Sequence, residues 1–324
     1  MENLQQNLYM KKELRFHPNG NFKIMMLSDI QEGIQYDIRT LENLEKALKK
    51  EKPDFVILGG DNCDGTILKT KDELKQYLDI FTKPMEMRKI PWAHVFGNHD
   101  HDLPVDDRIM QEIYESFPYC ISKHTEGIHG TTNFVLSIKA SNTEETIFHI
   151  WGIDTNNEIE DLKIGLKKQI YLSNVQEPVS QWNIIYFDQL MWYWNSSIQL
   201  EEFYQKKING IVVTHIAPWE SKILKDNPID TKLTGSTIEK LGLSALNSGF
   251  FSTVLQRGDI RCIACGHSHE NTFSGTFCDI QICLDGCAGY HAYGKDELRG
   301  VRIFELEEQN LEQIKTRMVY YKDL

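Results

Sequence analysis

The sequence predicts an α/β fold built on a largely parallel sheet, and two observations indicate it. In the first third of the chain, short apolar runs alternate with segments of helical periodicity. Each apolar run is hydrophobic throughout rather than at every second position, as expected of strands that are covered on both faces. Strands and helices in alternation are typical of parallel sheets whose strands are connected by helices.

Three strands are predicted first, at 22–29, 53–61 and 90–100, and each ends in polar residues. Between the first two strands, apolar residues recur at helical spacing: Ile38, Leu41, Leu44, Ala47 and Leu48. A second helix is predicted at 72–81, where the periodicity is less regular. Together these segments give the order strand, helix, strand, helix, strand.

The remaining elements are predicted to form a second sheet. The segments 133–140 and 146–155 resemble a hairpin-linked pair of strands, and buried strands are expected again at 209–218 and 259–269. The last apolar segments alternate more and are expected to close this second sheet: 276–286 and 299–308.

A long helix is predicted at 187–207, with Leu190, Trp194 and Ile198 as one buried stripe. The segment 221–249 is the best candidate for a long excursion between core strands. Such excursions often cover active sites as lids or pocket walls. No internal repeat or linker divides the sequence, so residues 1–324 are expected to form one domain with a core at about 22–305.

Composition and charge exclude several classes of function. The formal net charge is −12, from 47 acidic and 35 basic residues, which argues against a long nucleic acid as the partner. No apolar run approaches the ~20 residues of a membrane span, and the N-terminal residues do not resemble a secretory signal. The seven cysteines are an odd number, typical of reduced thiols. We therefore expect a cytoplasmic protein that does not bind membranes.

Residues of the metal-binding type end five of the predicted strands: Asp29, Asp61, Asn98 with His99, His215, and His267 with His269. In an open α/β sheet, ligands bind beyond the carboxyl ends of the strands, so these residues could converge. Carboxylate, amide and imidazole groups together suit Mn, Fe or Zn. A single Asp at a strand end is usually a helix cap or turn residue, but this ordered set favours a metal site.

The ordered motifs GDNC, GNHD, VVTH and GHSH, after the first Asp, resemble those of the calcineurin-like metallophosphoesterases, which include the purple acid phosphatases. Residues 266–294 and the segment FDQLMWYW are similar to a narrower purple-acid-phosphatase-like branch that includes a yeast cell-cycle phosphoesterase. The resemblance implies a four-layer α/β/β/α sandwich, in which two mixed sheets are flanked by helices.

The resemblance also implies a site for two divalent or trivalent metal ions. Asp61 would bridge the two ions, Asp29 and His269 would hold the first, and the second would be held by three residues: Asn98, His215 and His267. His99 matches the histidine of the family that contacts the phosphate and assists the leaving oxygen. His291 lies in a motif that resembles the narrower branch and could also reach the substrate.

One position departs from the common family pattern. Most members have a metal-binding His two residues after the first Asp, where this sequence has Gln31. Purple acid phosphatases also lack that His, and they have a Tyr three residues after the bridging Asp, where this sequence has Asp64. An amide oxygen is a weaker donor than imidazole for these metals. The first site is therefore expected to be weaker, or to be completed by Gln31, water or Asp64.

The implied activity is metal-dependent hydrolysis of phosphate esters by direct attack of a metal-bound hydroxide. A phosphomonoesterase acting on a small phosphorylated substrate or a phosphoprotein is favoured. Two alternatives stay open: a phosphodiesterase acting on small nucleotides, and a protein-binding scaffold that has kept the fold and lost catalysis. Gln31 is the feature that keeps the scaffold open, whereas the other ligand positions and His99 argue against it.

Overall fold

Two mixed β-sheets pack face to face at the centre of the molecule in the computed structural model, which describes residues 11–159 and 181–324. The five-stranded sheet contains, in spatial order, β12 (Lys315–Tyr320), β11 (Gly300–Glu307), β2 (Asn21–Leu27), β3 (Phe55–Gly59) and β4 (Trp92–Val95). The seven-stranded sheet contains β1 (Leu14–Arg15), β5 (Phe134–Lys139), β6 (Thr146–Gly152), β7 (Gly210–Val213), β8 (Ile260–Cys265), β10 (Ile280–Leu284) and β9 (Ser274–Phe277).

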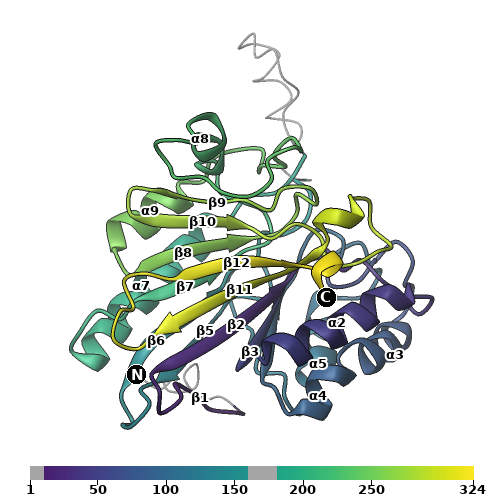
Figure 1. The fold of residues 1–324 in the computed structure, drawn as a ribbon, viewed down its shortest axis with the longest axis horizontal. Coiled ribbons are helices and arrows are strands. Elements are labelled where there is room, and N and C mark those ends of the chain that lie inside the picture. The colour runs from purple at the N-terminus through teal and green to yellow at the C-terminus, as the bar shows by residue number, and fades with distance from the viewer. Residues whose placement is uncertain (1–10, 160–180) are drawn as a thin grey trace.

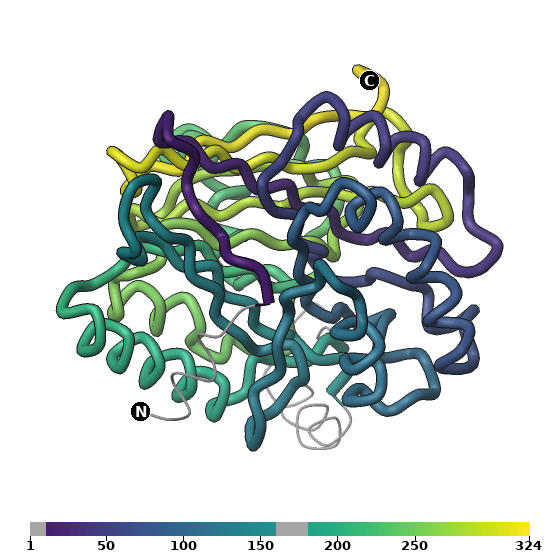
Figure 2. Tube along the Cα trace, turned by 90° about the horizontal axis from the view of Figure 1, so that it is seen from below, coloured from purple at the N-terminus to yellow at the C-terminus, as the bar shows by residue number. Residues whose placement is uncertain are grey.

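Helices cover the outer faces of both sheets (Figure 1). The five-stranded sheet is covered by α2 (Ile38–Glu51), α3 (Lys71–Phe81), α4 (Lys83–Arg88) and α5 (Asp107–Glu115). The seven-stranded sheet is covered by α7 (Phe187–Tyr204) and α9 (Phe250–Arg257). Figure 2 shows these two groups of helices on opposite sides of the strands. The predicted α/β/β/α sandwich is confirmed.

Alternation along the strands explains the layers. In β2, Met25 and Leu27 belong to the core beneath α2 and α3, whereas Ile24 and Met26 belong to the core between the two sheets. Successive side chains of a strand point to opposite faces of a sheet. A strand with helices on one face and a second sheet on the other is therefore apolar at every position, which is the pattern seen in the sequence.

The last apolar segments separate between the two sheets. β9 and β10 form a hairpin at the edge of the seven-stranded sheet, where 276–286 was expected. The prediction for 299–308 is wrong, because β11 lies in the five-stranded sheet, antiparallel to β2, with Phe304 opposite Ile24. Ile303 packs beneath the helices and Phe304 between the sheets. β11 needs both faces covered, and the position beside β2 covers both.

The buried stripe of α7 also differs from the prediction. Trp194 and Ile198 are only half-buried, and the fully buried positions are one residue away from them. The buried side chains of the helix are Gln189, Leu190, Tyr193, Ser197 and Leu200. The tyrosine and serine hydroxyls of this set donate hydrogen bonds to the buried carboxylate of Asp259. A buried carboxylate needs such donors, and this requirement selects the face that the helix presents.

Two further features of the described residues bear on the expectations from composition. All seven cysteines are free thiols, and all except Cys278 are buried. Within 11–159 and 181–324, none of the helices has both the length and the apolar character that crossing a bilayer requires.

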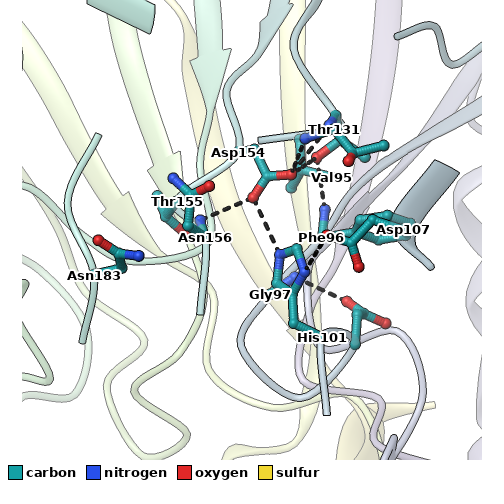
Figure 3. A network of polar contacts seen from close by, with 12 residues as sticks. Val95, Phe96, Gly97, His101, Asp107, Thr131, Asp154, Thr155, Asn156 and Asn183 are labelled. Carbon is teal, nitrogen blue, oxygen red and sulfur yellow. Dashed lines mark hydrogen bonds and ion pairs between the residues drawn. The ribbon is translucent and has the colours of Figure 1, made fainter. Parts of the chain in front are cut away.

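A buried ion pair connects the two sheets near their carboxyl ends. The ring of His101, in the loop after β4, lies between two carboxylates, that of Asp154 after β6 and that of Asp107 at the start of α5 (Figure 3). Nδ1 is 2.9 Å from Oδ2 of Asp107, and Nε2 is 3.4 Å from Oδ1 of Asp154. The other oxygen of Asp154 accepts from the backbone N–H groups of Thr131 and Thr132.

The two charges of this pair stabilise each other. Burial opposes the charged form of His101, but Asp154 and Asp107 outweigh it and raise the histidine pKa well above 6.5. Burial likewise opposes the charged form of Asp154, and His101 outweighs it and lowers the aspartate pKa below 3.8. The loop that carries Asn98 and His99 is thereby tied to the seven-stranded sheet.

Replacing His101 with Gln should lower the free energy of unfolding by about 3 kcal/mol near pH 6, because Asp154 is left buried without its cation. The raised pKa of His101 means that its contribution is complete below pH 6.5 and lost as the pH rises through that raised value. The lowered pKa of Asp154 means that its contribution is complete above pH 3.8 and lost in stronger acid. Urea unfolding at a series of pH values, from about pH 3 to about pH 11, measures both effects.

The matched control is His129→Gln, because that exposed histidine contacts Asp188 at the surface. We expect a change of less than about 1 kcal/mol in the control at every pH of the series. A difference in unfolding free energy between the wild type and the His101 variant that stays equally large up to the most alkaline pH would contradict the assigned ion pair.

Candidate metal centre

The predicted ligand residues meet at the carboxyl ends of strands from both sheets. Asp29, Asp61 and Asn98 follow β2, β3 and β4, and the three histidines follow β7 and β8 of the other sheet: His215, His267 and His269. Side-chain donor atoms of Asp61, His215 and His267 all lie within 4.8 Å of one another. The same holds for Asp29, Asp61 and His269, so the two groups share Asp61.

The backbone is strained where it delivers these groups. Asp29 and Asp61 have φ values of 53° and 52°, in the left-handed region that most side chains avoid. A Cβ added to Gly97 would lie 2.3 Å from Oδ1 of Asp61, so the chain can pass here only without a side chain. The left-handed turns at Asp29 and Asp61, and the absence of a side chain at Gly97, allow charged groups from the two sheets to lie close together.

The two aspartates are held as buried carboxylates. Oδ2 of Asp29 accepts from the Ser28 hydroxyl at 2.7 Å and from the backbone N–H of His267 at 2.8 Å. Oδ1 of Asp61 accepts from the backbone N–H of His99 at 2.7 Å. Burial opposes the charge on Asp61, but the imidazole of His215 outweighs burial and lowers the pKa of Asp61 below its usual range.

Several buried polar atoms at these strand ends have no hydrogen-bond partner in the described residues. In the described part of the chain, Oδ1 of Asp29, Oδ1 of Asn98 and Nε2 of His215 have no hydrogen-bond partner. Nε2 of His215 is 3.2 Å from Oδ2 of Asp61, without the alignment of a hydrogen bond. Buried polar atoms of this kind are normally satisfied. Carboxylate and imidazole donors that converge in this way, with an amide at the neighbouring strand end, fit transition-metal ions such as Mn, Fe or Zn.

Two of the three histidines that follow β7 and β8, His215 and His269, are oriented by backbone carbonyls. Nδ1 of His215 donates to the carbonyl of Gly59 at 3.0 Å, and Nδ1 of His269 donates to that of Tyr293 at 2.8 Å. In both rings Nε2 therefore faces the aspartates, and in His269 it lies 3.0 Å from Oδ1 of Asp29. Such a carbonyl contact fixes the tautomer that a metal-binding histidine needs. The Tyr293 ring also stacks on His269, with centroids 3.9 Å apart.

His99 stands beside this group with its ring facing a cavity. Its Nδ1 is 2.7 Å from Oδ2 of Asp102, which leaves Nε2 for a ligand in the cavity. Burial opposes the charged form of the ring, but the charge of Asp61 and the hydrogen bond to Asp102 outweigh it and raise the pKa of His99. The contact to Asp102 and the charge of Asp61 therefore favour the protonated ring.

Gln31 and Asp64, at the two positions that depart from the family pattern, contact other protein groups, and so does His291. Nε2 of Gln31 donates to Oδ2 of Asp61 at 2.8 Å. Asp64 accepts from the backbone N–H of Thr66 at 2.8 Å, and Nε2 of the half-exposed His291 lies 3.8 Å from its other oxygen. Metal binding by Gln31 or Asp64 and substrate contact by His291 stay predictions.

A cavity of about 790 Å³ opens over the centre, and Asp61, His99, His267 and His269 are part of its lining. Much of its wall comes from residues 219–245, which include α8 (Ser221–Asp226). The excursion predicted at 221–249 therefore covers the site. Sequence reasoning missed Trp182 and Glu239 in this wall, because neither lies in a motif and both reach the site through tertiary contacts.

Comparisons with known proteins agree with this geometry. The family model for calcineurin-like phosphoesterases matches residues 22–271. "Probable inactive purple acid phosphatase 14" of Arabidopsis thaliana is 26% identical over 331 residues, which cover 92% of this chain and 78% of the relative. Phosphatase DCR2 of Saccharomyces cerevisiae is 27% identical over 294 residues, which cover 82% of this chain and 48% of the relative.

Solved structures share the fold. A dimetal phosphatase from Danio rerio superposes with a TM-score of 0.54 at 13% identity, covering 93% of this chain and 99% of that one. GAP50, described as the anchor in the inner membrane complex of Plasmodium, gives a TM-score of 0.53 at 14% identity, covering 93% and 85%. The family model spans most of the chain and includes every strand end at which the buried donors converge. The chain therefore belongs to the calcineurin-like phosphoesterase family.

Proposed function

We propose that the protein is a metal-dependent phosphoesterase that hydrolyses phosphate monoesters at a dinuclear centre. The observation that supports it most is the buried Asp61, which belongs to both groups of converging donors. Asp29 and His269 would hold one ion, and the other would be held by three residues: Asn98, His215 and His267. The carboxylate, amide and imidazole donors suit Mn, Fe or Zn as the two metal ions.

Two ions held there would neutralise phosphate charge and would lower the pKa of a water molecule at the site. The chain's own contribution to leaving-group departure comes from His99. Asp102 holds Nδ1, so the protonated Nε2 can donate to a phosphate oxygen or pass its proton to the departing alcohol oxygen. The cavity beside His99 gives room for the alcohol portion of a small phosphorylated substrate or of a phosphoprotein side chain.

A chromogenic phosphate monoester and the matching diester, tested side by side, measure the proposed activity. The protein is first stripped with a chelator and then supplied with Mn, Fe(II) or Zn in turn. Metal-restored hydrolysis that favours the monoester supports the proposal. Preference for the diester would instead support the phosphodiesterase alternative.

A second candidate function is a scaffold that keeps the fold and binds partners without turnover. It is supported by Gln31, whose amide contacts Asp61 where most of the family has a metal-binding histidine. The Arabidopsis relatives that carry "probable inactive" in their names point the same way. Protein that binds metal and hydrolyses neither ester would favour this candidate.

Asp61→Asn and His99→Ala should separate metal binding from catalysis. Asp61→Asn removes the charge shared by both donor groups, so the protein should lose both ions, as measured by elemental analysis. His99→Ala should keep its metal and lose about 10²- to 10⁴-fold in kcat, the usual size of a general-acid contribution. Asp72→Asn, at an exposed position of α3, serves as the control. Equal metal loss in the two site variants would refute the separate roles.

Gln31→His should strengthen the site nearest Asp29, because imidazole is a better donor for these metals than an amide oxygen. The left-handed backbone at Gln31, with φ at 44°, also tolerates histidine better than a branched residue. Dialysis against graded chelator concentrations measures metal retention. Gln31→Ala is the control, since it removes the contact to Asp61 and adds no ligand. Identical retention in the two variants would show that position 31 does not reach the metal.

A further inference from the structure

The cavity over the metal centre is much larger than a phosphate group requires. Its volume of about 790 Å³ lies in the range of pockets for drug-sized ligands. A phosphate held near Asp61 and His99 would fill only a part of it. The rest of the cavity is available to the group that is esterified to the phosphate, so its walls select that group.

Two tryptophans supply flat apolar surface to these walls. Trp182 packs edge-on against His267, with ring centroids 4.7 Å apart, so it stands directly beside the metal centre. Nε1–H of Trp219 donates to the carbonyl of Ser244 at 3.1 Å, which fixes the orientation of that ring. The Trp219 side chain is nevertheless 39% exposed. Rings that are oriented before a ligand arrives lose little entropy on binding it.

Leucine side chains continue this apolar surface, and the charged groups of the wall interact with one another. Leu241 and Leu243 belong to the lining beside the two tryptophans. Nζ of Lys222 is 2.6 Å from a carboxylate oxygen of Asp226. Nζ of Lys225 donates to the backbone carbonyl of Glu239.

The carboxylate of Glu239 is also engaged. It accepts from the hydroxyl of Tyr293 and from the backbone N–H of Glu270. These four charged side chains already have partners within the protein, so the apolar surface of the wall is what we expect to select a substrate.

We infer that the cavity selects phosphate monoesters of arylalkyl or aryl alcohols, whose flat apolar group packs against Trp219 and Trp182. This inference rests on the proposed phosphoesterase function and names its substrate class. Trp219 is the residue to mutate, because its indole is held by the carbonyl of Ser244. Trp182 is unsuitable, because its ring contacts His267, a candidate metal ligand. An aromatic ring stacked on an indole gains free energy beyond simple burial.

The experiment compares benzyl phosphate with propyl phosphate in the metal-loaded protein. The two leaving alcohols have similar acidity, so the ratio of the kcat/KM values reports binding of the alcohol group rather than intrinsic reactivity. We expect the wild type to favour the benzyl ester by about tenfold or more. Trp219→Ala should bring the ratio of the kcat/KM values close to one, the value without selectivity. Trp219→Phe should keep most of the preference for the benzyl ester. The ratio does not depend on the fraction of active protein.

Binding of benzylphosphonate and propylphosphonate, measured by calorimetry, gives a readout that does not require turnover. Trp194→Ala, on α7 and outside the cavity lining, is the matched control and should keep the wild-type ratio. Similar affinities for the two phosphonates, or an unchanged ratio in Trp219→Ala, would overturn the inference and leave the phosphoesterase proposal standing. Selective binding of benzylphosphonate without hydrolysis of either ester would overturn the phosphoesterase proposal and leave the inferred selectivity of the cavity standing. Neither binding nor hydrolysis by protein that carries two metal ions would overturn both.

Discussion

The rest of the site depends on two buried carboxylates, those of Asp29 and Asp61, which need hydrogen-bond donors and positive charge around them. A carboxylate removed from water is costly unless donors and opposite charges surround it. Ser28, backbone N–H groups and Gln31 supply the donors, and the imidazoles of His215 and His269 face Oδ2 of Asp61 and Oδ1 of Asp29. The left-handed turns that end β2 and β3 follow from this requirement, because only a sharp turn places two strand-end carboxylates together.

This origin explains why so much of the site could be predicted from sequence. The chemistry lies at the ends of short buried strands, and each strand end is a local feature: an apolar run followed by a carboxylate, an amide or an imidazole. Parallel neighbours such as β2, β3 and β4 bring their carboxyl ends to one edge regardless of the loops between them. The sandwich of two sheets came from the family resemblance, and the apolar runs alone did not contain it.

What sequence could not provide depends on contacts between distant segments. The face of α7 is set by Asp259, which attracts the hydroxyls of Tyr193 and Ser197, and a helical wheel of apolar residues cannot show that partner. Trp182 reaches the site only because it packs on His267. Glu239 connects the excursion to the metal centre through Tyr293, whose ring stacks on His269. Each of these contacts joins segments that no local pattern relates.

The position of β11 has a consequence for how the chain acquires its structure during synthesis. β11 lies between β2 and β12, so β2 obtains one of its two neighbours only after residues 300–307 have been synthesised. Pairings of this kind have high contact order and form slowly. Until then the edge of β2 is open to pairing with other chains. The pairing of β11 with β2 thus completes, late in the sequence, the sheet on which Asp29 is mounted.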